Sequence, residues 1–104
     1  MPWGSWINEL PTEFFMVVHI AAFAIGASFA WLAFKRELNL LGAAFSLFAA
    51  AEVVYMTYHL DWTVFLFAHT IAEVLDLVAF VLVFAAAVVQ VAGVRRPALE
   101  ASRG

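Results

Sequence analysis

The chain has no cysteine, and between Arg36 and Arg95 it has neither lysine nor arginine. The absence of cysteine excludes disulfides, thiolate metal ligands, iron–sulfur clusters and a cysteine nucleophile. With five basic residues in 104 and a net charge of −3, the chain also lacks the basic surface typical of nucleic-acid binding. The first 13 residues hold two acids and no base, so we expect no cleaved signal peptide there.

Apolar residues, by contrast, are abundant. The chain is 66% hydrophobic and 12% charged, with a mean hydropathy of +0.98, which is typical of an integral membrane protein. A bilayer is crossed by about 20 mostly apolar residues, and residues 13–34, 38–59 and 62–92 each reach that length. Because the connections are short, neighbouring helices should be antiparallel. We therefore predict an all-α fold with three transmembrane helices in an up-down-up bundle.

The basic residues that do occur predict the orientation of these helices. Lys35-Arg36 and Arg95-Arg96 flank the same side of the predicted bundle, and cytoplasmic loops carry the excess of such residues. We expect an N-terminus outside the cell membrane and a C-terminus in the cytoplasm. Residues 1–12 should lie along the outer surface, residues 13–96 form the transmembrane domain, and Pro97 should end the third helix, leaving 97–104 as a cytoplasmic tail.

Acids and histidines interrupt the apolar segments without any base beside them. An ionised acid at a helix centre costs about 2.5 to 3.5 kcal/mol on insertion scales. Glu52, Glu73 and Asp76 together would cost on the order of 8 kcal/mol if they faced lipid. Such groups must be protonated, paired with imidazolium, bound to a cation or neutralised by another subunit. The residues concerned are His19, Glu52, His59, Asp61, His69, Glu73 and Asp76.

Helical spacing gathers most of these side chains onto shared faces. Glu52 and His59 are seven residues apart on the second predicted helix, which returns them to nearly the same angular position. On the third, His69, Glu73 and Asp76 stand at i, i+4 and i+7, the spacing that stacks side chains on one face.

The first predicted helix adds His19 on the same face as Ala22, Gly26 and Ala30, whose small side chains let another helix approach closely. With a rise of about 1.5 Å per residue, His19, Glu52, His69 and Glu73 lie roughly 8 to 17 Å below the outer membrane boundary. The sequence therefore predicts one site that opens toward the outside.

A divalent metal is the first interpretation of this site. Imidazole and carboxylate groups bind zinc, iron, manganese and copper, and His69-x3-Glu73 presents one of each a helical turn apart. Helical bundles build metal sites from such positions on facing helices. We expect His19, Glu52, His69 and Glu73 as ligands, with His59 and Asp76 as further candidates.

Haem b or a chlorophyll-type pigment is a second interpretation, with axial nitrogens from His19, His59 or His69. A haem has no need of three additional acids, however.

A third interpretation is a proton or cation path. The cytoplasmic half of the predicted helices offers only Ser28, Ser46 and Gln90 for such a path. The non-catalytic alternative is a structural subunit of a larger complex, in which partner chains neutralise the acids.

The segment His69-Thr-Ile-Ala-Glu73-Val-Leu75-Asp76, followed by an apolar run, resembles the final helix of small uncharacterised archaeal multi-pass membrane proteins. In those proteins that helix has the form His-x3-Glu followed by Leu-Asp, often with a second histidine where this chain has Val74. The resemblance implies that these polar positions are used together, and no activity comes with it.

Three helices form a thin bundle, so we expect partners, either further copies of the chain or other membrane subunits. Serine and threonine occur without the glycine context of a nucleophile elbow, which argues against an enzyme formed by this chain alone. The function that these features predict is metal binding, as part of a membrane redox or sensing complex.

Overall fold

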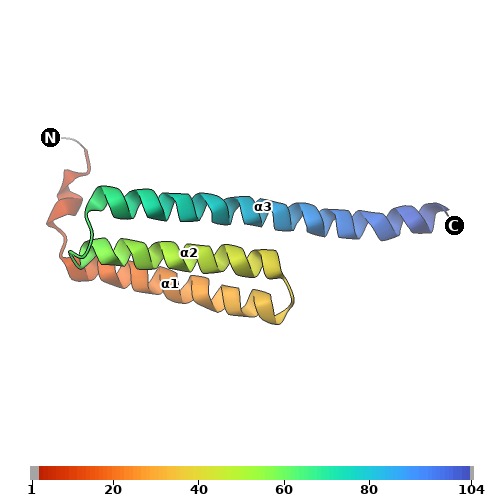
Figure 1. The fold of residues 1–104 in the computed structure, drawn as a ribbon, viewed down its shortest axis with the longest axis horizontal. Helices are drawn as coiled ribbons and strands as arrows, with labels where there is room; N and C mark the ends of the chain where they lie inside the picture. The colour runs from red at the N-terminus through yellow and green to blue at the C-terminus, as the bar shows by residue number, and fades with distance from the viewer. Residues whose placement is uncertain (1–2, 104) are drawn as a thin grey trace.

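The computed structural model describes the backbone of residues 3–103 and the side chains of residues 3–93. A short 3-10 helix, η1 (Ser5–Glu9), precedes three α-helices, α1 (Thr12–Lys35), α2 (Asn39–His59) and α3 (Phe65–Arg103). All regular structure in residues 3–103 is helical (Figure 1), which confirms the predicted all-α class. Thr12–Lys35, Asn39–His59 and Phe65–Gly93 are long and apolar enough to cross a membrane. The fold thus fits a multi-pass membrane protein.

The three helices lie side by side in one layer with α2 in the middle. Helix α2 packs against α1 on one side and against α3 on the other, whereas α1 and α3 do not pack against each other in the part of the chain described. The overall extents are 66 × 31 × 20 Å, and the shortest of them is the thickness of the layer (Figure 1). Such an arrangement leaves α2 accessible in the groove between the two outer helices.

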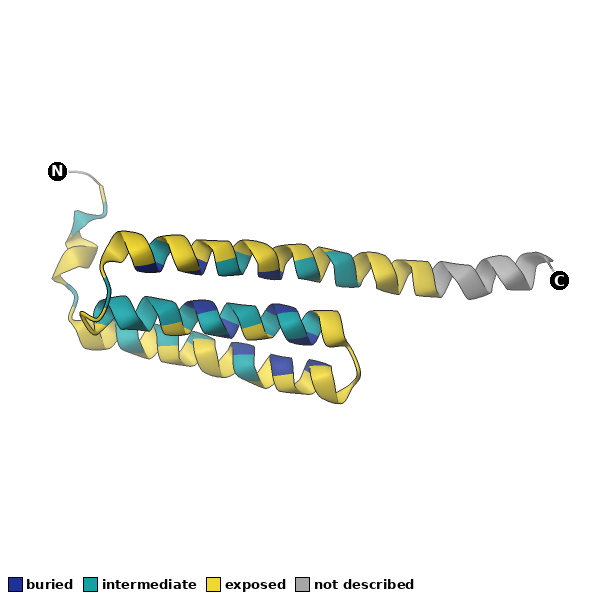
Figure 2. Ribbon diagram, in the orientation of Figure 1, coloured by how far each residue is buried: buried dark blue, intermediate teal, exposed yellow. Residues whose placement is uncertain are grey.

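Small residues make both helix–helix interfaces. The buried apolar side chains of residues 3–93 are all alanines, joined by the buried Gly26 and Gly42. Membrane helices associate through such residues because their backbones can then approach closely. Gly26 and Ala30 are buried on α1, which confirms the predicted packing face. Large apolar side chains such as Phe80 and Leu66 are exposed instead, and a bilayer would cover them. Exposed positions follow the length of α1 and α3 (Figure 2).

Both interhelical turns have the same pattern of main-chain hydrogen bonds. After α1, Leu38 N–H donates to Ala33 C=O and Glu37 N–H to Phe34 C=O, with Glu37 at a φ of 62°. After α2, Asp61 occupies the equivalent place at a φ of 63°. This is the Schellman arrangement, in which a left-handed residue satisfies the last free carbonyls of a helix. Glycine is the usual residue there, and its absence removes the sequence signal for these ends.

The third helix differs from its predicted range of 62–92 at both ends. It begins at Phe65 because residues 60–64 complete the turn, where Thr57 and Thr63 hydroxyls lie 3.0 Å apart. The prediction that Pro97 ends the helix was wrong, since the backbone remains helical to Arg103. An interior proline removes one main-chain donor and crowds the carbonyl four residues earlier, so it disfavours a helix without excluding one, and the residues after it include good helix formers, alanine, leucine, glutamate and arginine.

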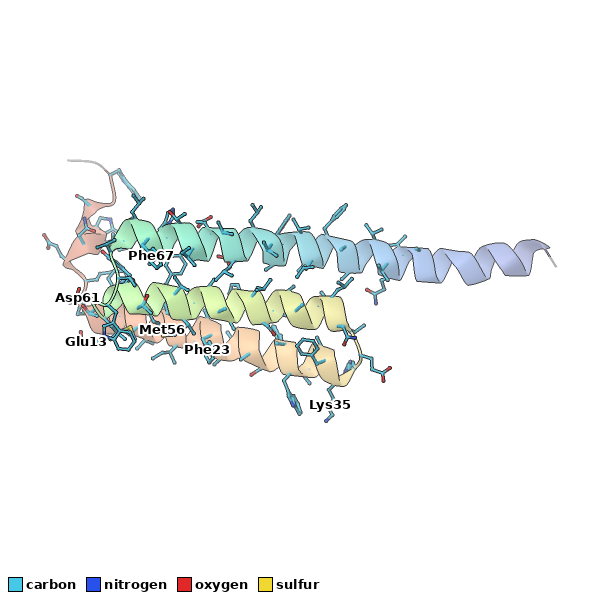
Figure 3. The ribbon with its side chains drawn as sticks, in the orientation of Figure 1. Glu13, Phe23, Lys35, Met56, Asp61 and Phe67 are labelled. Atoms are coloured by element: carbon cyan, nitrogen blue, oxygen red, sulfur yellow. The ribbon has the colours of Figure 1, made fainter. Side chains whose placement is uncertain are left out.

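Charge is unevenly divided between the two ends of the layer. Glu13 and Asp61 lie at the end that also holds η1 and the α2–α3 turn, whereas Lys35 lies at the opposite end (Figure 3). The Lys35 ammonium stands 4.7 Å from the ring centre of Trp31, a cation–π contact. We call the end with η1 the outer end and the end with Lys35 the inner end, following the predicted orientation.

Candidate functional site

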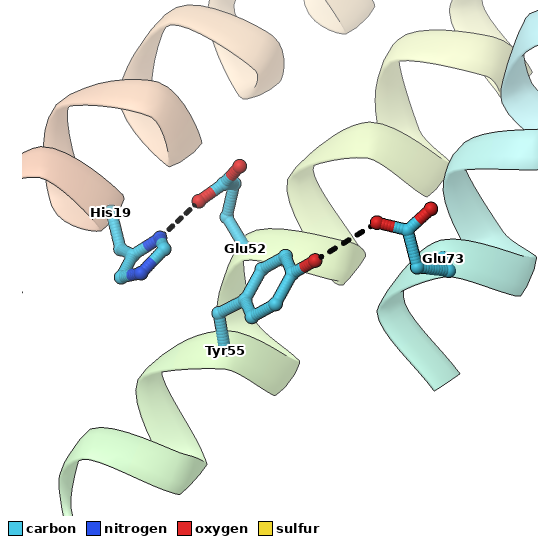
Figure 4. Close-up of polar contacts among 4 residues, drawn as sticks. All are labelled: His19, Glu52, Tyr55 and Glu73. Atoms are coloured by element: carbon cyan, nitrogen blue, oxygen red, sulfur yellow. Dashed lines mark hydrogen bonds and ion pairs between the residues drawn. The ribbon is translucent and has the colours of Figure 1, made fainter. Parts of the chain in front are cut away.

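The central contact of the site joins α1 to α2. His19 Nδ1 lies 2.5 Å from Glu52 Oε2, and the two side chains are only 17% and 12% exposed (Figure 4). A carboxylate can only accept hydrogen bonds, so an ionised Glu52 requires the proton on Nδ1 of His19. This is the one ion pair among residues 3–93. Two residues of the predicted site are therefore in direct contact.

Two aromatic side chains of α2 lie next to the His19 imidazole. Tyr55 stacks on it with ring centres 5.3 Å apart and planes 14° apart. The His59 ring centre lies 5.1 Å away at 32°, and His59 in turn stacks on Phe15 at 4.9 Å and 5°. The four rings form a row at the outer end of the α1–α2 interface. Ring stacking restricts rotation of the imidazole, so His19 is oriented toward Glu52.

Tyr55 also connects this row to α3. Its hydroxyl donates to Glu73 Oε1 at 3.3 Å (Figure 4). The contact is longer than the His19–Glu52 contact, and Glu73 is exposed. Two polar contacts, one between α1 and α2 and one between α2 and α3, thus lie next to each other, with the Tyr55 ring between them. All three transmembrane helices contribute to this part of the site.

Asp76 stands one helical turn inward from Glu73. Its Oδ1 atom is buried and has no hydrogen-bond partner among residues 3–93. Apart from Lys35 and Arg36 at the inner end of α1, those residues contain no lysine or arginine that could pair with it. Its carboxyl borders an apolar groove formed by all three helices.

The remaining candidates are more peripheral. His69 stacks on Phe65 of its own helix at 5.2 Å and 19°, and no hydrogen bond of its ring is found among the described residues. Phe65 also contacts Tyr58 at 5.4 Å, so aromatic packing links the start of α3 to the end of α2. Asp61 is a turn residue with a positive φ.

The structure therefore divides the predicted ligand set. His19 and Glu52 are in contact, His59 is adjacent to His19, and Glu73 joins them only through Tyr55. Within residues 3–93, no three histidine, aspartate or glutamate side chains converge closely enough to hold a metal ion in this conformation. A bound metal would therefore require side-chain movements.

A haem or pigment ring would need a different arrangement of the histidine rings from the one observed. The rings of His19 and His59 are adjacent and tilted by 32°, with centres 5.1 Å apart. Axial ligation by this pair would require both ring nitrogens to point at an iron between them. The two helices would have to separate before a haem could enter at that point.

Tyr55 is the functional residue that the sequence-based selection omitted. Its signal was the spacing Glu52-x2-Tyr55-x3-His59, which places all three side chains on one stripe of α2. The predicted site included only acids and histidines, and a phenol that donates to a carboxylate belongs to neither group.

No protein-family model, no curated protein and no solved structure matches the chain.

Proposed function

We propose that the outer half of the groove binds a divalent transition metal, with His19, Glu52 and His59 as the donors. The observation that carries this proposal is the contact between His19 and Glu52. An imidazole nitrogen and a carboxylate oxygen from different helices already point at each other with most of their surface covered. A metal ion would replace the proton that the pair shares, as in other sites whose ligands bind in their deprotonated forms.

The second imidazole comes from His59, whose ring is adjacent to that of His19. Turning this ring off Phe15 would bring a third donor to the pair. The resulting set of two imidazoles and one carboxylate suits zinc, iron, manganese or copper. Tyr55 then holds Glu73 at the edge of the site, where the carboxylate would be a further ligand or orient one through water. His69 and Asp76 would take part only after larger movements.

Electrostatics supports a cation at this position. Glu52, Glu73 and Asp76 place up to three negative charges in the outer half of an apolar layer whose lysine and arginine residues all lie on the inner side. A divalent ion would offset the cost of those charges, which is large in a low dielectric. A lysine or arginine at the same depth would compete with the ion, so the absence of both residues from this region has a functional reason.

Neutralisation by a partner chain, as in a purely structural subunit, has less support from the geometry. Glu52 already has an imidazole partner within the chain, and Glu73 has a phenol. A copy of the chain or another membrane subunit remains part of the proposal, because a single layer of helices covers the groove on one side only. In that assembly the chain would hold the metal of a redox or sensing complex and would not catalyse a reaction alone.

The test is a titration of the purified, chelator-treated full chain in detergent with Co²⁺, followed by its visible absorption, and with Zn²⁺, followed by elemental analysis. We expect one metal ion per chain and a tenfold or greater loss of affinity in His19→Ala and Glu52→Gln. Glu9→Gln removes an exposed carboxylate of η1 and is the matched control.

Circular dichroism would verify that each variant keeps its helices. The proposal is wrong if the folded wild-type chain binds no stoichiometric metal, or if the folded His19→Ala and Glu52→Gln chains bind it as the wild type does. An absorption band of a haem or pigment in the preparation would favour the cofactor interpretation instead.

A further inference from the structure

A second, separate feature lies inward of the site, in the same opening between α1 and α3. It is an apolar groove of about 370 Å³ that all three helices line. Its walls include four phenylalanine rings, Phe29 from α1, Phe45 and Phe48 from α2, and Phe80 from α3. Ligand pockets in proteins have volumes of roughly 300 to 1,000 Å³. We call this feature the inner groove.

Asp76 is the only residue with a polar side chain in the lining of the inner groove. Its Oδ1 atom is buried without a hydrogen-bond partner in the described residues. The nearest charged groups along the site are the carboxyls of Glu52 and Glu73, which add negative potential instead of neutralising it. A carboxyl placed in such surroundings attracts a positive charge that is not surrounded by water.

The phenylalanine rings of the inner groove also favour a positively charged ligand. The face of a phenyl ring is negative and attracts cations, and the attraction grows when water is excluded. Phe29 is 48% exposed and Phe80 74% exposed, so their rings also reach the surface that a bilayer would cover. The groove can therefore be entered from the lipid, where apolar molecules concentrate.

The dimensions distinguish a small molecule from a partner helix. On α2 the lining covers residues 44–48, little more than one turn, and on α3 it covers 76–83, about two turns. A crossing helix would lie along a longer furrow. The short groove, its aromatic walls and its single carboxyl fit one compact ligand.

We propose that the inner groove binds a lipophilic organic cation, an ammonium or phosphonium ion with an apolar body. The cationic centre would lie next to Asp76, and the apolar groups would fill the space between the phenylalanine rings. No metal takes part, so this site is separate from the proposed metal site and can be tested when that one is empty.

The experiment is equilibrium dialysis of the purified full chain in detergent with radiolabelled tetraphenylphosphonium, in the presence of a chelator and with detergent alone as the blank. Tetraphenylborate, an anion of nearly the same shape, is the matched ligand. We expect saturable binding of one tetraphenylphosphonium per chain and no saturable binding of labelled tetraphenylborate, which is dialysed alone in a parallel experiment because the two ions pair with each other in solution.

Asp76→Asn keeps the shape of the side chain and removes its charge, and we expect it to weaken binding roughly tenfold or more. Phe80→Ala, at a mostly exposed position, should weaken it several-fold. Glu9→Gln should bind as the wild type does. Non-saturable uptake, equally tight saturable binding of tetraphenylborate, or unchanged binding by folded Asp76→Asn and Phe80→Ala would overturn the proposal. A groove already filled by a helix of a second copy would appear as absence of binding, and it too would overturn it.

Discussion

The two hydrogen bonds that connect the helices of the site should differ sharply in strength, and double-mutant cycles can measure both. The first cycle combines His19→Ala with Glu52→Ala, and the second combines Tyr55→Phe with Glu73→Ala. The cycles subtract what each side chain contributes on its own and leave the coupling energy of the pair. The second pair serves as an internal comparison, since it lies in the same layer and joins the next two helices.

The geometry of each pair predicts its coupling energy. His19 and Glu52 are 2.5 Å apart and 17% and 12% exposed, so their hydrogen bond is short and largely shielded from water. A hydrogen bond to a charged group contributes about 1.5 to 3 kcal/mol, while polar contacts between membrane helices average about 0.6 kcal/mol. We expect about 2 kcal/mol of coupling for this pair. Tyr55 and Glu73 are 3.3 Å apart and Glu73 is exposed, so we expect about 0.5 kcal/mol there.

The assay is reversible unfolding in mixed micelles with increasing denaturant, followed by circular dichroism in the presence of a chelator, so that bound metal contributes nothing. Equal slopes of the free energy of unfolding against denaturant would show that all variants unfold to a similar state. A coupling below about 0.5 kcal/mol for His19 and Glu52, or equal coupling in the two cycles, would refute the argument that burial and distance set the strength of these contacts.

Two further predictions concern packing and orientation. A Cβ atom at Gly26 would lie 2.7 Å from Cδ1 of Phe48, so Gly26→Ala should lower the free energy of unfolding by about 1 to 3 kcal/mol, and the loss should disappear in a Phe48→Ala background. Gly93→Ala, with no neighbouring atom within 4 Å, is the control and should be neutral or stabilising by up to about 1 kcal/mol. Because the chain has no cysteine, single substitutions can report orientation: in intact cells a membrane-impermeant maleimide should label Ser5→Cys and not Asn39→Cys, and the reverse pattern would contradict the predicted topology.

Much of the fold follows from composition and spacing. Apolar length alone predicted three spans, and the first two agree with α1 and α2 to within a residue at each end. The face of α1 that carries Gly26 and Ala30 is the packing face, as its small residues indicated. The start of α3 was missed because Asp61 takes the left-handed position that glycine usually marks, and a hydrogen bond between threonine hydroxyls extends the turn.

The site was only partly accessible to sequence reasoning. Periodicity says which residues share a face of one helix, and it groups Glu52 with His59 on α2 and His69 with Glu73 and Asp76 on α3. It says nothing about how far a helix is rotated toward its neighbour. That rotation, together with the choice of rotamer, brings His19 to Glu52 and leaves His69 against Phe65. Distances between side chains of different helices depend on packing that no single-helix pattern contains.

The order of the helices in the layer explains why one opening can hold two different chemistries. With α2 in the middle and small residues on both of its interfaces, α1 and α3 are held apart and the polar stripe of α2 remains accessible between them. That stripe changes along its length from His59, Tyr55 and Glu52 at the outer end to phenylalanines further in. The proposed metal site uses the imidazole and carboxylate groups of the outer part, whereas the proposed organic-cation site uses the apolar space beside Asp76. If α1 and α3 instead closed over α2, both proposed sites would be lost together.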